Sequence, residues 1–168
     1  TERLVGSEMC IRDRSYGHQI DIEGGKISLA AGGGEGGFGI RILDDGKFGF
    51  AYLVDVNSAD TAIKNALSIA RMSPSVPGFV LPSAQSAQQV SDLYDSSVVD
   101  MSSEDLLIQA DDIISEVASL DKRAVVTGGG IGVSANASAI FSSEGVDAAG
   151  VTTSHGVGVQ VSIDEGGQ

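Results

Sequence analysis

The sequence has no tryptophan, only three prolines and a single cysteine, Cys10, among its 168 residues. One cysteine cannot form an internal disulfide or a cluster of thiolate ligands for zinc, so both kinds of site are excluded, and the redox compartment stays open. Long apolar runs are missing too, and none approaches the roughly 20 residues that a membrane-spanning helix needs. The sequence therefore predicts no membrane span.

Basic residues are scarce. Ten Lys and Arg stand against 23 Asp and Glu, which gives a net charge of −13. Phosphate backbones and anionic lipid surfaces would repel such a chain, so we expect neither nucleic acid nor a membrane as a partner. The content of 42% hydrophobic and 20% charged residues fits a single globular domain.

The first residues differ in composition from the rest. The stretch LVGSEMCIRDR, Leu4 to Arg14, contains the only cysteine and resembles the translation of a transposon-based sequencing-library adapter. We therefore predict that residues 1–14 are not native, and that residues 15–168 are the natural domain, shortened at both ends. The alternative is an ordinary N-terminal segment.

Two β-hairpins are predicted in the first third of the chain. Apolar and polar residues alternate in HQIDIEGGKISLAA, residues 18–31, on both sides of Gly24-Gly25. The pattern recurs in FGIRILDDGKFGFAYLV, residues 38–54, around Asp45-Gly46, and Asp-Gly between alternating runs is a strong hairpin signal. We expect four antiparallel strands here, each with one buried face.

Two amphipathic helices are predicted next. Apolar residues recur at helical spacing from Ala59 to Ala70, Asn57 or Ser58 can cap the start, and Pro74 ends the helix near Ser73. An extended connection follows at residues 73–83. The second helix is predicted within SSEDLLIQADDIISEVASL, residues 102–120, where Ser102 or Ser103 can cap its start. Its predicted apolar stripe is Leu106, Ala110, Ile113, Ile114 and Val117.

The last part, residues 123–164, predicts about three more strands, with turns at Gly128 to Gly130 and at Glu144-Gly145. The order of four strands, two helices and about three strands indicates an α+β fold. We expect a largely antiparallel sheet of about seven strands with the two helices packed on it.

Glycine-rich stretches do not predict a nucleotide site. GGGEGG has the G-x-G-x-x-G spacing at Gly32, Gly34 and Gly37. A pyrophosphate needs a helix N-terminus directly afterwards, whereas here a strand pattern follows. TGGGIG, residues 127–132, fails for the same reason. Flexible connections between strands explain both stretches.

The titratable residues likewise predict no active site. His18 and His155 are the only histidines, and a zinc site would need carboxylates such as Asp147 or Asp164 to complete it. Ser154 and His155 are neighbours on a strand and point to opposite faces, so they cannot easily pair. The pairs Asp44-Asp45 and Asp111-Asp112 fit solvated charge. We name no catalytic, cofactor-binding or metal-binding residue.

Three stretches together resemble the N-terminal domain of the TldD/PmbA family of metallopeptidase-related proteins. They are EGGFGIRILDDGKFGFAYLVD at residues 35–55, ALSIARMSPSVPG at 66–78, and residues 121–164. The family's G-x-G-x-R strand is matched by Gly37, Gly39 and Arg41, and its G-F-A-Y run by residues 49–52. Ser142 stands where the family often has Asn. The linker at residues 70–78 favours the PmbA type.

The resemblance implies a peptidase function located elsewhere in a longer chain. TldD-type subunits bind zinc through H-E-x-x-x-H and a distant cysteine, and PmbA-type subunits lack that motif. Neither feature is present here, so the resemblance implies a fragment that is inactive alone, with zinc only in a full-length TldD-type subunit. It also implies a cytoplasmic homo- or heterodimer with a paralogue, enclosing a chamber for unfolded or modified peptides.

We expect an extended peptide to be held by hydrogen bonds at a strand edge, because pairing with a backbone tolerates many sequences. The alternative function is a non-enzymatic, β-rich binding or assembly module whose strands merely resemble the family.

Overall fold

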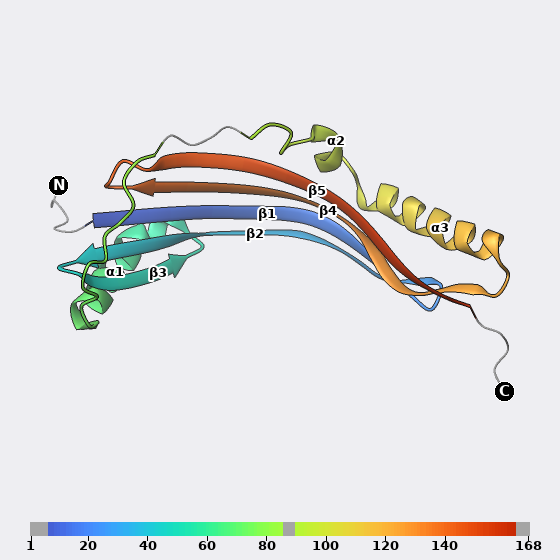
Figure 1. The fold of residues 1–168 in the computed structure, drawn as a ribbon, viewed down its shortest axis with the longest axis horizontal. Coiled ribbons are helices and arrows are strands. Elements are labelled where there is room, and N and C mark those ends of the chain that lie inside the picture. The colour runs from blue at the N-terminus through green and yellow to red at the C-terminus, as the bar shows by residue number, and fades with distance from the viewer. Residues whose placement is uncertain (1–6, 86–89, 164–168) are drawn as a thin grey trace. The chain divides into compact units, whose positions relative to one another are not determined.

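The computed structural model describes residues 7–85 and 90–163. In this part of the chain, five strands form one sheet in the order β3-β2-β1-β4-β5, with neighbours antiparallel (Figure 1). The strands are β1 Ser7–Glu23, β2 Lys26–Asp44, β3 Lys47–Leu53, β4 Ala124–Ser142 and β5 Asp147–Ile163.

The chain forms two compact units, and each contains part of the sheet and one long helix. Unit 1 comprises Thr1–Arg14, Glu35–Ser91 and Ala137–Val151, and unit 2 comprises Ser15–Gly34, Asp92–Asn136 and Thr152–Gln168. Residues 7–14, whose origin we predict to be an adapter, lie in β1. Among the described residues, no helix is long and apolar enough to span a membrane.

The α+β class and the antiparallel sheet are confirmed, but the expected number of strands is wrong. The connections predicted at residues 32–37 and 128–130 lie inside β2 and β4. The chain therefore has three strands before the helices where we expected four, and two strands after them where we expected three. Glycine lowers strand propensity, yet its backbone can still extend and pair in a sheet when the neighbouring strands supply partners. Local composition therefore indicated breaks that the sheet does not have.

The predicted hairpin turns are confirmed. Gly24, Gly25, Asp45 and Gly46 all have positive φ, with values of 57°, 73°, 50° and 70°. Two consecutive residues of positive φ are the mark of the type I′ turn, which matches the twist of antiparallel strands. In the β2–β3 pair, Asp44 stands opposite Lys47 and Phe38 opposite Leu53. Glu144 and Gly145 likewise lie in the turn between β4 and β5.

In unit 1, helix α1 (Ala59–Met72) follows the short 3₁₀ helix η1 (Val56–Ser58) and packs on β2 and β3. Its buried residues are all alanines, Ala62, Ala66 and Ala70. Ala62 and Ala66 lie in a core with Ile40, Ile42 and Leu53. A Cβ atom at Gly49 would clash with the carbonyl oxygen of Ala66, so the helix backbone lies directly on the strand. The helix ends at Met72, before Pro74, as predicted.

In unit 2, helix α3 (Ser103–Leu120) packs on β1 and β4. Leu106 and Ala110 are fully buried, and the other residues of the predicted stripe pack on the same core. Ser102 caps the helix in a capping box with Asp105, as the sequence indicated. The short helix α2 (Ser96–Val99), which precedes α3, was not predicted.

Strand β4 changes face once along its length. Val126 and Ile131 lie five positions apart, and in a regular strand they would point to opposite faces. Both nevertheless are buried in the same core cluster. Gly129 lies between them with a φ of 147°, a conformation that favours glycine. A bulge at Gly129 therefore shifts the alternation by one residue.

Candidate functional site

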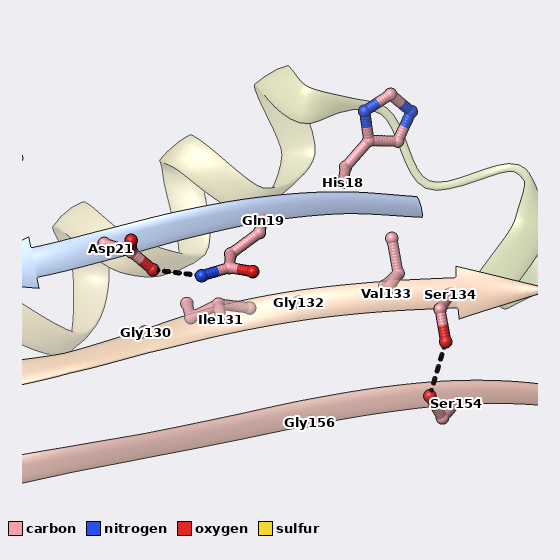
Figure 2. A pocket seen from close by; sticks show the side chains of 10 residues that line it. All are labelled: His18, Gln19, Asp21, Gly130, Ile131, Gly132, Val133, Ser134, Ser154 and Gly156. Atoms are coloured by element: carbon pink, nitrogen blue, oxygen red, sulfur yellow. Dashed lines mark hydrogen bonds between the residues drawn. The ribbon is translucent and has the colours of Figure 1, made fainter. Parts of the chain in front are cut away.

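A hollow of about 380 Å³ lies on the sheet of unit 2 (Figure 2). Gln19 and Asp21 alternate along β1 with Ile20 and Ile22, which are buried in the core that contains α3. They therefore point to the face opposite α3. The hollow lies on that face. It is lined by His18, Gln19, Asp21, Gly130, Ile131, Gly132, Val133, Ser134, Ser154 and Gly156.

The floor of the hollow consists largely of bare backbone. Gly130 and Gly132 alternate on β4 with the buried Ile131 and Val133, and Gly156 lies on the neighbouring strand β5. The nearest atom to a Cβ at Gly132 would be the backbone oxygen of His18 at 3.5 Å, and no atom would lie within 4 Å of one at Gly156. The absence of these side chains creates the depression.

The walls of the hollow are polar. The Gln19 amide nitrogen donates a hydrogen bond of 2.6 Å to the Asp21 carboxylate. The hydroxyls of Ser134 and Ser154 are hydrogen-bonded to each other at 2.9 Å, across β4 and β5. Asp21 is the only acidic residue in the lining, which contains no lysine or arginine. The walls therefore present mainly hydrogen-bond acceptors and one negative charge.

His18 contributes backbone to the hollow, but its ring lies on the side of α3 (Figure 2). The ring nitrogens Nδ1 and Nε2 are each 2.9 Å from a hydroxyl, that of Ser103 and that of Tyr16 respectively. The Tyr16 and His18 rings also meet edge to face, with centroids 5.1 Å apart. These contacts place the His18 ring in the packing of α3 on the sheet, away from Ser134 and Ser154.

The other residues considered from the sequence do not gather into a site. Ser154 turns toward Ser134, and the exposed His155 is its neighbour on the strand, so the two cannot act as nucleophile and base. Asp147 is exposed, and Asp164 lies outside the described residues. Among the described side chains, no group of three or more His, Cys, Asp or Glu residues is placed so that it could hold a metal ion such as zinc.

The paired acids do not line the hollow. The Asp44 carboxylate is 3.9 Å from Nε of Arg71 in unit 1, and Asp45 occupies the β2–β3 turn. Asp111 and Asp112 are exposed on α3. Their positions agree with the interpretation as solvated charge.

The glycines of the G-x-G-x-x-G spacing have a packing role in β2. A Cβ at Gly32 would clash with the His18 ring, and one at Gly34 would lie 3.3 Å from the Tyr16 ring. A Cβ at Gly37 would clash with the Tyr52 side chain. β2 continues to Asp44, so no helix begins after Gly37. These glycines make room for flat side chains from neighbouring strands.

Several carboxylates at the ends of helices accept hydrogen bonds that lower their pKa. The hydroxyl and the backbone N–H of Ser102 lower the pKa of Asp105. In the same way, the hydroxyl and N–H of Ser97 lower the pKa of Asp95 at the start of α2. The Arg123 side chain lowers the pKa of Asp121 just after α3. The shifts of Asp105 and Asp95 reflect helix capping, and that of Asp121 reflects its ion pair with Arg123.

Sequence reasoning missed the hollow. Its signal in the sequence is short: in GIGVS, residues 130–134, glycines alternate with Ile131 and Val133. Such alternation predicts a strand with one apolar face and one bare face. It does not reveal that β1 and β5 place Asp21, Gln19 and Ser154 around that bare face.

Comparison with known proteins finds a family whose first domain is matched by part of this chain. Residues 13–70 match the family model described as PmbA/TldA metallopeptidase domain 1. The predicted resemblance to the PmbA/TldD family is thus confirmed over these residues. An uncharacterized protein of Methanocaldococcus jannaschii, MJ0231, is 29% identical over 136 residues, which are 80% of this chain and 30% of that protein.

Solved structures share the PmbA/TldD domain fold. TldE from Thermococcus kodakarensis has a TM-score of 0.89 at 21% identity, over 95% of this chain and 37% of that one. A Thermotoga maritima protein named for a suggested role as a modulator of DNA gyrase has a TM-score of 0.85 at 13% identity, over 96% and 37% of the two chains. At these identities the likeness concerns the fold alone. The chain thus spans little more than a third of these relatives.

Proposed function

We propose that this chain is the first domain of a PmbA/TldD-type metallopeptidase subunit, and that it serves in subunit assembly and in forming a chamber for unfolded or modified peptides. The observation that carries the proposal is the match of residues 13–70 to a metallopeptidase domain 1. The partner in this proposal is a second copy or a paralogue of the same family, and the proposed location is the cytoplasm.

The proposal assigns binding, and not bond cleavage, to the described residues. Zinc in a full-length TldD-type subunit would activate a water molecule for peptide hydrolysis. The described residues contain no cluster of ligands that suits this ion. Their part in the function is therefore to hold chain segments, either of a partner subunit or of a peptide.

The outer edge of β5 supports this role. β5 is the last strand in the sheet order, and residues 148–163 contain no Asp, Glu, Lys or Arg. Edge strands are usually protected from pairing by charged side chains or by proline. The backbone N–H of Thr153 donates to the carbonyl of Leu93, which covers the edge at that point. From His155 to Ile163, an extended segment could add to the edge through backbone hydrogen bonds.

Peptidase assays test the enzymatic part of the proposal. The source DNA is first sequenced past both ends of this chain, and the longer product is expressed with its paralogue. We expect zinc-dependent cleavage of unfolded peptides by the complex, and none by the 168-residue chain. Zinc-dependent cleavage by the short chain alone would contradict the proposal.

Substitution at the β5 edge tests the binding part. Val157 has the same strand parity as Thr153, so its N–H points to the outer edge, and Val157→Pro removes that donor. We expect the change to weaken association with the partner or an unfolded peptide, as measured by light scattering and by titration. Val157→Thr is the control that keeps the N–H. Equal association of the two variants would exclude the edge as the binding surface.

A further inference from the structure

We propose that the hollow in unit 2 binds the arginine side chain of a peptide. This inference goes beyond the proposed function, because it concerns the face of the sheet opposite α3 and needs neither zinc nor the outer edge of β5. It rests on the shape of the hollow floor and on the chemistry of its walls.

The floor suits a flat side chain, as other glycines of this sheet show. On β2, flat side chains lie where glycine leaves space: His18 at Gly32, Tyr16 at Gly34 and Phe50 at Gly39. The Phe50 ring, for example, would be 3.1 Å from a Cβ at Gly39. Rings from a neighbouring strand commonly cover strand glycines in this manner.

Two glycines of the hollow, Gly132 and Gly156, have no such cover, whereas the Asp21 carboxylate lies 3.3 Å from the Cβ position of Gly130. Around Gly132 and Gly156, no side-chain atom lies within 4 Å of the Cβ position. Both glycines line the same hollow, on adjacent strands. The described part of the chain thus provides a flat floor like those on β2 but no flat group to cover it.

The walls select a positively charged donor. Asp21 is the only carboxylate in the lining, no basic side chain opposes it, and the whole chain has a net charge of −13. Because the Gln19 nitrogen already donates to Asp21, its amide oxygen remains as a further acceptor. Of the two hydrogen-bonded serines, whichever donates within the pair still offers lone pairs on its oxygen.

Arginine satisfies both requirements at every physiological pH, whereas histidine is planar but largely uncharged at pH 7. The arginine guanidinium is planar, carries five donors and no acceptor, and pairs well with a carboxylate. Lysine supplies the charge but is not flat, and an aromatic ring is flat but has no charge. The hollow therefore combines the planar contact and the acceptors that a guanidinium needs.

Peptide titration on the intact chain tests the assignment. Three blocked tripeptides are compared, with arginine, citrulline or lysine at the centre, and the amide resonances of Gly130, Gly132 and Gly156 are followed by NMR. Citrulline has nearly the shape of arginine without its charge. Since hydrogen bonds to charged groups exceed neutral ones in strength, we expect arginine to bind about tenfold more tightly than citrulline. Equal affinities, or shifts confined to unit 1, would overturn the proposal.

Two pairs of variants locate the site. Asp21→Asn should reduce the affinity for the arginine peptide to that for citrulline, whereas Asp111→Asn removes the same charge from the exposed face of α3 and should leave it unchanged. Gly156→Val should abolish binding by filling the floor, whereas Gly150→Val on the same strand should not. Both glycines have open space at the Cβ position, so the fold tolerates both changes.

Unchanged affinity for the arginine peptide in Asp21→Asn or Gly156→Val would also exclude the hollow as its binding site. If either variant fails to fold by circular dichroism, the comparison of arginine with citrulline on the unaltered chain still decides. These results are independent of the Val157→Pro test, so the proposal for the hollow and the proposal for the β5 edge can be disproved separately.

Discussion

The two units of this domain reach the same arrangement, a helix on a sheet, with side chains of opposite size. In unit 1 the contact is made by alanines of α1 over Gly49, where the helix backbone touches the strand. In unit 2 the contact is made by Leu106 against Ile20 and Ile131, all almost fully buried. Close packing can therefore be reached by bringing backbones together or by filling the space with branched side chains.

The helix starts differ as well. α3 begins with a reciprocal capping box between Ser102 and Asp105. At the start of α1, Ser58 makes no side-chain cap, and Asp55 instead accepts from the N–H of Asn57 at the preceding 3₁₀ turn. Unit 2 thus depends more on specific side chains, and unit 1 depends more on close backbone contact. Four substitutions test this difference.

The largest effect is expected from Leu106→Ala in unit 2. The change leaves a cavity in a fully buried position, so the free energy of unfolding should fall by about 4 kcal/mol. Denaturant titration measures the loss, and hydrogen exchange should show weaker protection in unit 2. Ile108→Ala, at a residue that is 56% exposed, is the control and should cost less than 1 kcal/mol. Similar losses for both would show that α3 does not pack as described.

Gly49→Ala should produce the next largest effect, in unit 1. The added methyl clashes with the carbonyl of Ala66, so α1 must move away from β3 at a cost of about 3 kcal/mol. Hydrogen exchange of the α1 amides reports the change. Gly150→Ala, in an open position of the same unit, should leave stability nearly unchanged. A stable Gly49→Ala protein would contradict the close contact.

Ser102→Ala tests the difference in capping. Loss of the side-chain cap should lower the free energy of unfolding by about 1 kcal/mol. Ser58→Ala, at the cap position of α1, removes no side-chain cap hydrogen bond and should have little effect. Thermal unfolding of the two variants compares their losses of stability. A larger loss for Ser58→Ala would contradict the statement that the side-chain cap is at α3 and not at α1.

The smallest effect is expected in the pH dependence of stability at acidic pH. Because hydrogen bonds from Ser102 lower the pKa of Asp105 below its ordinary value of 3.8, the folded state favours the carboxylate. Its contribution to stability is present above pH 3.8 and is lost as the pH falls through the lowered pKa. Asp105→Asn should therefore flatten the fall in stability below about pH 4. Unfolding midpoints of the two proteins across this range check the prediction, and parallel curves would contradict it.

Much of the fold could be predicted because it is recorded in short stretches of sequence. The helix stripe from Leu106 to Val117 follows from a period of 3.6 residues, and the turn at Asp45-Gly46 follows from the need for positive φ. The error in the number of strands has one cause. Glycines at 32–37 and 128–130 weaken a strand locally, but pairing with neighbouring strands of the sheet keeps them extended.

By itself, the sequence determined the α+β class, the two amphipathic helices and the hairpin turns. Those properties depend on residues close together in the chain. Only the tertiary structure decided that Asp21, Gly132 and Ser154 surround one hollow and that His18 faces away from it. Their proximity depends on the order and register of β1, β4 and β5, which are set by the packing of the whole sheet and not by local composition.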